Sequence, residues 1–147
     1  MILRAAHPTD AGAVGAILSE FIDDTDWMPR IHTRAEDLAH AGTLIDRGWV
    51  TVAEVDGAVA AFLARDRATI HALYVTAVRQ NRGLGKALLD AAKSEAPALQ
   101  LWTFQSNNGA IRFYRREGFA EVERTDGRGN DEGLPDIRFH WRKEIAA

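Results

Sequence analysis

The feature that most restricts the fold is a change of hydrophobic period in the middle of the chain. Apolar and polar positions alternate with a period of two in three runs, residues 49–55, 58–64 and 69–75. The first two runs are separated by Asp56-Gly57, and an Asp-Gly turn between alternating runs is a strong signal for a β-hairpin. From residue 84 the apolar positions return at helical spacing. We therefore expect a three-stranded meander that leads into a helix.

Further elements flank this meander on both sides. A short first strand is expected to precede two helices, one over residues 9–23 and one that is capped by Thr33 and ends near Gly48. On the C-terminal side the pattern predicts, in order, a strand at 99–104, a short helix ended by Gly118, and strands at 119–122 and 137–141. The stretch from Thr125 to Pro135 is predicted to be a long loop. The order β-α-α-β-β-β-α-β-α-β-β is that of an α+β, or mixed α/β, domain.

Composition narrows the classes of protein to consider. The 147 residues suit one domain, 1–147, and the 46% hydrophobic and 27% charged residues are typical of a globular protein in water. The N-terminus lacks the apolar core of a secretory signal, so we expect a cytoplasmic protein without a membrane partner. The absence of cysteine excludes a disulfide framework, a thiolate zinc site and a cysteine nucleophile. A net charge of −3 gives no general attraction to nucleic acid, and none is expected as a partner.

Two glycines stand at the junction between the third strand of the meander and the helix that follows it. Gly83 and Gly85 have no Cβ, so their backbone N–H groups can approach a ligand closely. The first turn of a helix also has unpaired N–H donors and a partial positive charge, which suit a phosphate group. Arg79, Arg82 and Lys86 add cationic side chains. The junction is therefore predicted to bind phosphates.

The spacing of these glycines disfavours two common nucleotide-binding loops. A Walker A loop would need Gly at position 80 and Ser or Thr at position 87, but these positions hold Gln80 and Ala87. A dinucleotide fingerprint would need a third glycine at position 88, which is Leu88. Nucleoside triphosphates and dinucleotides are therefore not the expected ligands.

The pattern Gln80-x-x-Gly83-x-Gly85 resembles motif A of the GNAT superfamily of acyl-CoA N-acetyltransferases. The preceding Leu73-Tyr74-Val75 looks like the splayed fourth strand of that family, and Asn107-x-x-Ala110-x-x-Phe113-Tyr114-x-x-x-Gly118-Phe119 is similar to its motif B. In element order the resemblance covers the whole chain. It implies a GNAT-like fold, with a central, mostly antiparallel mixed sheet of about seven strands, splayed between strands 4 and 5, and about four helices on its faces.

The resemblance also implies acetyl-CoA as co-substrate, without a metal ion. Backbone N–H groups from Arg82 to Lys86 would hold the pyrophosphate, the main chains of Leu73 and Val75 would bind the pantetheine arm, and Asn107 would contact that arm from the other side. The residues expected around the cofactor are Leu73, Tyr74, Val75, Arg79, Gln80, Arg82, Gly83, Leu84, Gly85, Lys86, Asn107, Phe113 and Tyr114.

Acetyl transfer to an amine requires a deprotonated amine and a proton for the departing thiolate. The resemblance implies that Tyr114 is the general acid. For the base, strict strand alternation would place His71 on the same face as Leu73 and Val75, and a histidine titrates near neutral pH. A structural histidine bonded to a neighbour is an equally good interpretation. Glu54 is a second, weaker candidate.

In the family the walls of the acceptor pocket are the first two helices with their loop, and the loop between the last two strands. Here these segments supply Trp27, His32 and Asp136, with further acids around them. An acidic pocket with an aromatic ring would suit a cationic amine, although solvated loop acids are also common. We expect an N-acetyltransferase that uses direct attack by a primary amine in a ternary complex. The alternative is an inactive acyl-CoA-binding regulatory domain. The amine acceptor would be a small molecule or a peptide. The sequence is also compatible with a homodimer.

Overall fold

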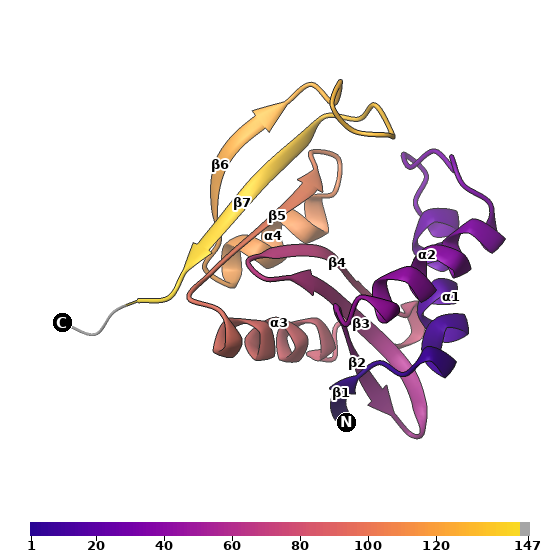
Figure 1. Ribbon diagram of the computed structural model, residues 1–147. Coiled ribbons are helices and arrows are strands. Elements are labelled where there is room, and N and C mark those ends of the chain that lie inside the picture. Colours follow the sequence, from indigo (N-terminus) through magenta and orange to yellow (C-terminus); the bar gives the residue numbers. More distant parts are fainter. Residues whose placement is uncertain (145–147) are drawn as a thin grey trace.

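The computed structural model describes residues 1–144 and confirms the expected order of elements (Figure 1). The strands are β1 Ile2–Ala5, β2 Val50–Val55, β3 Ala58–Asp66, β4 Thr69–Val75, β5 Ala98–Phe104, β6 Ala120–Thr125 and β7 Asp136–Arg142. The helices are α1 Ala11–Asp24, α2 Arg34–Asp46, α3 Leu84–Glu95 and α4 Asn108–Arg116. Two one-turn 3-10 helices are also present: Pro8–Asp10 takes up the start of the helix expected over residues 9–23, and Ala77–Arg79 lies where the sequence pattern shows no element. Strand β6 runs further than the expected 119–122, so the long loop starts after it.

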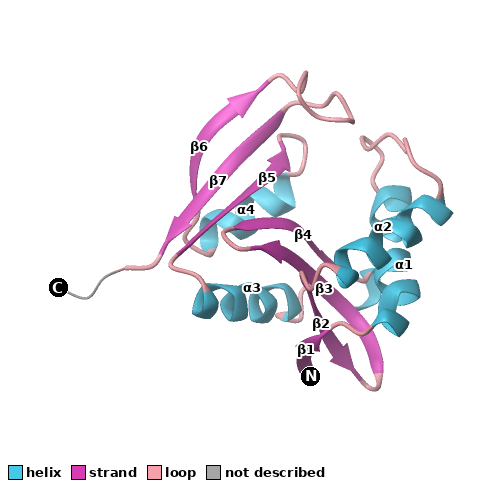
Figure 2. Ribbon diagram, viewed as in Figure 1, coloured by secondary structure: helices cyan, strands magenta, loops and turns pink. Residues whose placement is uncertain are grey.

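The seven strands form one sheet in the order β1-β2-β3-β4-β5-β7-β6. Every neighbouring pair is antiparallel except β4 and β5, which are parallel and joined only at Thr69 and Gln100. That contact lies at the start of β4, so the two strands separate towards their C-terminal ends (Figure 2). The mixed sheet with a splay between strands 4 and 5 is therefore confirmed.

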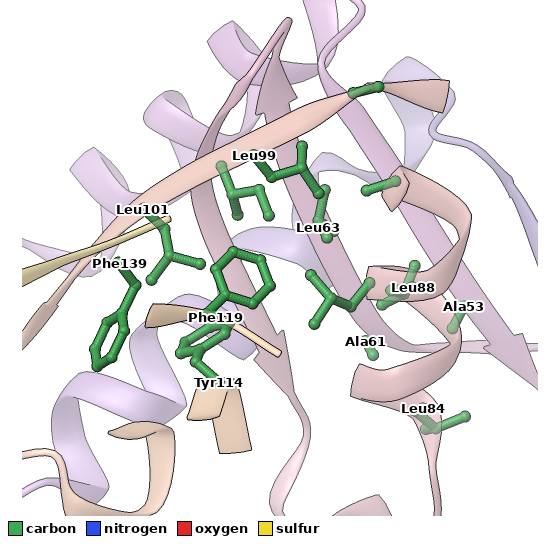
Figure 3. Close-up of a cluster of buried hydrophobic side chains, with 14 of the residues drawn as sticks. Ala53, Ala61, Leu63, Leu84, Leu88, Leu99, Leu101, Tyr114, Phe119 and Phe139 are labelled. Carbon is green, nitrogen blue, oxygen red and sulfur yellow. The ribbon is translucent and has the colours of Figure 1, made fainter. Parts of the chain in front are cut away.

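The helices cover the sheet on both faces, and each face has its own hydrophobic core. Helices α1 and α2 pack on one face, where Val14, Leu44 and Phe62 are buried. Helices α3 and α4 pack on the other face, where the larger core includes Leu88, Leu99, Tyr114, Phe119 and Phe139 (Figure 3). Within residues 1–144, none of the helices combines the length and the apolar character needed to cross a membrane.

Helix α1 approaches the backbone of α2 closely, and a capping box fixes the start of α2. A Cβ added at Gly15 would lie 2.9 Å from the Cα of Leu38, so only glycine fits at this crossing without a shift. The hydroxyl of Thr33 accepts the N–H of Glu36 at 3.1 Å, and the Glu36 carboxylate accepts the N–H of Thr33 at 3.0 Å. This reciprocal cap explains why α2 begins where the sequence predicts.

Strand β4 contains a β-bulge that overturns one expectation. Ala64 of β3 pairs with Ala72 while Arg65 pairs with Ile70, so His71 is the extra residue. The extra residue reverses the alternation of side chains between the two faces of the sheet, so residues before and after the bulge no longer follow one pattern. Leu73 and Val75 pack on the α3 side of the sheet, whereas the His71 ring stacks on Trp49, which packs against the core under α1 and α2. The prediction that His71 shares a face with Leu73 and Val75 is wrong for this reason.

Candidate active site

The splay between β4 and β5 opens into a cavity of about 620 Å3. Its walls come from the C-terminal half of α1, the end of β4, the turn that leads into α3, and α4. Twelve of the residues that the sequence links to the cofactor line this one cavity: Leu73, Tyr74, Val75, Arg79, Gln80, Gly83, Leu84, Gly85, Lys86, Asn107, Phe113 and Tyr114. Arg82, the remaining member of that set, is exposed on the same turn. Motifs that lie far apart in the sequence thus meet at one place.

The end of β4 presents main-chain groups to this cavity. The N–H of Thr76 donates to the carbonyl of Ala60 on β3 at 2.8 Å, which fixes the direction of the Thr76 peptide group. Successive residues of a strand direct their main-chain groups to opposite edges, so those of Val75 face the β5 side. Because β5 has already separated there, none of the described strands pairs with them. The Gln80 side chain donates to the Val75 carbonyl at 3.3 Å, and the Val75 N–H remains a donor for a ligand.

The turn after β4 has the geometry of an anion cradle. Asn81 and Gly83 have positive φ values of 62° and 82°, and Gly83 is the N-cap of α3. A Cβ added at Gly83 would have no neighbouring atom within 4 Å, so the space in front of this turn is open. The first N–H groups of α3 face that space without helical partners. At Gly85 an added Cβ would make ordinary contact with the Phe113 ring at 3.6 Å, so α3 and α4 lie close together here.

Acidic side chains already engage two of the cations beside the cradle. Lys86 Nζ lies 2.9 Å from Glu117 Oε1 and 3.2 Å from Asp90 Oδ2. These hydrogen bonds, first that of Glu117, raise the pKa of Lys86 and keep it protonated. Arg79 pairs with the exposed Asp56 at 3.1 Å. Among the described residues, Arg82 has no ion-pair partner. Backbone donors and Arg82 are therefore the groups most available to a pyrophosphate.

Tyr114 joins the core to the cavity. Its ring packs against Phe113, Phe119 and Phe139, at centroid distances of 5.1, 5.5 and 6.2 Å. Burial, with a smaller contribution from Tyr74, raises the pKa of Tyr114 well above its ordinary value of 10. Burial also raises the pKa of Tyr74 to about 12. Both phenols are therefore protonated at neutral pH, and the one on Tyr114 can donate a proton into the cavity.

Asn107 also lines the cavity, together with residues that the sequence analysis did not find, among them Glu20 and Arg116. The Asn107 side-chain oxygen caps α4 by accepting the N–H of Ala110 at 3.1 Å, so its amide nitrogen is the group that can face a ligand. Glu20 of α1 accepts the Ala77 N–H at 2.8 Å and the Thr76 hydroxyl at 3.1 Å. Arg116 lines the cavity and lies over the Phe113 ring at 5.5 Å. The Glu20 contacts join distant parts of the chain, and no local pattern in the sequence signals them.

A second cavity, of about 530 Å3, lies at the end of β5, on the side of the β6–β7 loop. It is lined by Trp102, Thr103, Phe104, Thr125, Gly129, Asn130, Glu132 and Asp136. The Trp27 ring contacts Phe104 edge-on at 5.8 Å, so the loop after α1 reaches the same end of the sheet as the β6–β7 loop (Figure 1). Arg30 braces that first loop by binding Asp23 and Asp37, each at 2.9 Å.

Three predicted site residues, Trp27, His32 and His71, are not among the described residues that line either cavity, and of these only Trp27 contacts a lining residue, Phe104. His32 is exposed, lies 3.7 Å from Glu36, and is not among the described residues that line either cavity. The His71 ring stacks on Trp49 at 5.0 Å, and the Arg47 guanidinium lies 4.8 Å from the centre of the same Trp49 ring. An aromatic stack of this kind is a packing arrangement, and its position near the start of β4 is remote from the cradle.

Comparison with known proteins agrees with this geometry. Residues 46–121, just over half of the chain, match the family model for the acetyltransferase (GNAT) domain. The chain belongs to the GNAT acetyltransferase family. Members of this family use acetyl-CoA. The cradle and the splayed strand thus lie where a GNAT acetyltransferase is expected to receive its acyl donor.

Individual GNAT relatives match part of the chain. An uncharacterised N-acetyltransferase of Methanocaldococcus jannaschii is 35% identical over 92 residues, covering 52% of this chain and 41% of that protein. The peptidyl-lysine N-acetyltransferase YiaC of Escherichia coli is 33% identical over 78 residues, covering 52% of each. The chain therefore spans about half the length of the curated relatives it matches. The structure of YncA from Salmonella typhimurium with its cofactor acetyl-CoA has a TM-score of 0.73 at 24% identity, covering 100% of this chain and 96% of that one.

Proposed function

We propose that the protein transfers the acetyl group of acetyl-CoA to a primary amine by direct attack in a ternary complex. The observation that carries this proposal is the convergence of the anion cradle, the unpaired edge of β4 and the Tyr114 side chain on one cavity. The cradle offers donors for a pyrophosphate, the strand edge offers donors and acceptors for an amide-containing arm, and Tyr114 offers a proton. Acetyl-CoA contains both of these parts and supplies a thioester as the activated acyl group.

Different residues would bind the pyrophosphate and the pantetheine arm of acetyl-CoA. The N–H groups from Arg82 to Lys86, with the Arg82 side chain, would hold the pyrophosphate. The main chains of Leu73 and Val75 would bind the pantetheine arm from one side, and the Asn107 amide would bind it from the other. The side chains of Lys86 and Arg79 contribute less to phosphate binding, because acids already engage them.

Proton transfer is the chemical task left to the chain. In the net reaction the amine nitrogen forms a bond to the acetyl carbon, the carbon–sulfur bond breaks, the nitrogen loses a proton and the sulfur gains one. Tyr114 is the proton donor for the sulfur in this proposal, because its phenol is protonated at neutral pH and lines the cavity. His71 was predicted as the base on the ground of strand alternation, and the bulge removes that ground. Its stack on Trp49 favours a structural role.

The acceptor would enter from the second cavity, between the loop after α1 and the β6–β7 loop. Asp136 lines this cavity, and Trp27 contacts its wall at Phe104, which supports the predicted role of both in substrate binding. The exposed position of His32 beside Glu36 gives no support for such a role.

The alternative function is an acyl-CoA-binding regulatory domain without turnover. The place of Tyr114 in the donor cavity favours the enzyme, since binding alone requires no proton donor there. The deciding experiment is a panel of primary amines with acetyl-CoA, in which a thiol reagent detects free coenzyme A. The chain has no cysteine, so the protein itself gives no thiol signal. The enzyme predicts amine-dependent thiol release, whereas saturable acetyl-CoA binding without release by any amine would establish the alternative.

A further inference from the structure

Among the described residues, three acidic side chains are strongly buried, and their partners differ. Asp37, Glu117 and Asp136 have 3%, 9% and 9% of their surface exposed. Asp37 pairs with Arg30 at 2.9 Å, and Glu117 pairs with Lys86 at 2.9 Å. Asp136 instead accepts hydrogen bonds from the Thr125 hydroxyl and, at 3.1 Å, from the Asn130 amide, both of which are neutral. Within residues 1–144 it is the one strongly buried acid without a cationic partner.

Two basic side chains near Asp136 in the sequence are bound to other groups. Arg138 follows it by two residues on β7 and binds Glu123 at 2.6 Å and Gln100 at 3.3 Å. Arg128, in the β6–β7 loop, is 91% exposed and pairs with Asp126 at 3.0 Å. A buried carboxylate without a counter-charge is unfavourable unless a cation compensates it. No cationic side chain within residues 1–144 forms an ion pair with Asp136, so a cationic ligand can take that place.

The walls around Asp136 also suit a cation. In the register of β5 and β7, Phe104 lies directly opposite Asp136, and Trp102, the next residue on that face of β5, is 46% exposed. Aromatic ring faces attract cations. The lining adds a second carboxylate, Glu132, and includes no Lys, Arg or His among the described residues. Burial and, after it, the negative charge of Glu132 raise the pKa of Tyr74, which lines the donor cavity.

We infer that this second cavity receives a small primary amine in its ammonium form, with Asp136 as its counter-ion, and that it selects amines that carry no carboxylate. The ammonium releases one proton to solvent before its nitrogen attacks, and the second proton that the nitrogen loses balances the one that the sulfur gains. The volume of about 530 Å3 lies in the range of small-molecule sites. A carboxylate next to the amine, as in a free amino acid, would meet Asp136 and Glu132 and be repelled. The inference rests on the proposed function, because it names the class of acceptor for the same reaction.

The test compares amines that differ only in a carboxylate. Tyramine is paired with tyrosine, cadaverine with lysine, and agmatine with arginine, and a lysine-containing peptide is a further arm. Coenzyme A release should show kcat/KM at least about tenfold higher for each decarboxylated member, and higher for cadaverine than for the peptide. Equal rates within each pair, or a peptide preferred tenfold over cadaverine, would overturn the inference and leave the proposed acetyltransferase intact.

Asp136→Asn tests the counter-ion directly. Asparagine keeps the shape and both hydrogen bonds, because the Thr125 hydroxyl can accept from the new amide nitrogen while the Asn130 amide donates to the oxygen. Asp136→Asn should lower kcat/KM for tyramine about 10- to 100-fold, which is the range for a lost charge-assisted contact. The ratio of kcat/KM for tyramine to that for tyrosine should become smaller. The affinity for acetyl-CoA should not change. Asp126→Asn, an exposed acid of the same loop, is the control and should behave as wild type.

A direct binding measurement tests amine binding at Asp136 separately from acetyl transfer. Tyramine is titrated into the wild-type protein and into Asp136→Asn in the presence of coenzyme A, with NMR shifts as the readout. Saturable binding that Asp136→Asn weakens would support the cavity even if no amine released thiol, in which case only the proposed function fails. Unchanged tyramine binding by a folded Asp136→Asn protein would overturn the inference, whatever the turnover.

Discussion

Removal of one oxygen atom from Tyr114 tests the proposed proton transfer. Tyr114→Phe keeps the ring and its contacts with Phe113, Phe119 and Phe139, so the hydrophobic packing is preserved. Within residues 1–144 every fully buried polar side-chain atom has a hydrogen-bond partner, but the Tyr114 hydroxyl has none. The hydroxyl is therefore not fully buried, and it reaches the cavity that Tyr114 lines. Its loss should change the free energy of unfolding by no more than about 0.5 kcal/mol.

The effect on turnover should be far larger. General acid catalysis contributes roughly 100- to 10,000-fold, which corresponds to about 3–5 kcal/mol of activation free energy. We expect kcat to fall within that range, or by less if water reaches the sulfur, while the affinity for acetyl-CoA is unchanged. Tyr74→Phe makes the same deletion in the chain's other tyrosine, which lines the same cavity, and should cost less.

The assay is coenzyme A release under conditions in which chemistry limits the rate, established by a rate that does not depend on solvent viscosity. Thermal unfolding and calorimetry with acetyl-CoA show whether fold and donor binding are intact. A folded Tyr114→Phe protein with the wild-type kcat under these conditions would refute the role of Tyr114 as the acid.

Three further predictions concern stability and the role of His71. Gly15→Ala should lower the free energy of unfolding by about 1–3 kcal/mol, because the added Cβ would lie 2.9 Å from a backbone atom of Leu38. Gly12→Ala is the control and should not lower it, because an added Cβ there has no neighbouring atom within 4 Å. Chemical denaturation measures both variants. The pKa of Tyr74 is about 12 in the folded protein and about 10 in the unfolded chain. The contribution of the protonated Tyr74 phenol to the free energy of unfolding is therefore complete below pH 10 and is lost as the pH rises towards 12. Urea unfolding at pH 9–11.5 should show a smaller loss of stability in Tyr74→Phe than in the wild type. His71→Ala should leave the pH profile of kcat unchanged and lower stability, because the stack on Trp49 is lost; disappearance of an ionisation near pH 6–7 would instead restore the base.

Local chemistry explains why the order of elements could be predicted from the sequence, and the family resemblance explains why the residues around the first cavity could be named. The Asp-Gly turn, the Thr33 cap and the change of hydrophobic period are all signals between near neighbours in the chain, and the structure follows them. The turn from Gln80 to Lys86 has a fixed spacing, and that spacing determines which groups face the cavity. Such features need no knowledge of distant parts of the chain.

Features that depend on long-range contacts could not be predicted in this way. Alternation assigns a face to each strand residue only if the strand is regular, and the bulge at His71 arises from its pairing with β3. Glu20 reaches Ala77 across 57 positions of the sequence. Asp136 was predicted from its loop, but its lack of a cationic partner is visible only once Thr125 and Asn130 are seen around it. The ion pairs that engage Lys86 and Arg79 are likewise tertiary contacts.

The most direct test of the account is calorimetric titration of acetyl-CoA into the wild-type protein, Gly83→Glu and Gly48→Glu. Both glycines have positive φ, 82° and 77°, and open space around an added Cβ, so the two variants carry the same backbone strain. Only the glutamate at position 83 would face the pyrophosphate, and repulsion at about 4 Å between partly screened charges is worth several kcal/mol. We predict one-to-one binding by wild type and Gly48→Glu, and affinity at least about a hundredfold weaker for a folded Gly83→Glu protein. Equal affinity in all three proteins would contradict the assignment of this turn as the site that holds acetyl-CoA.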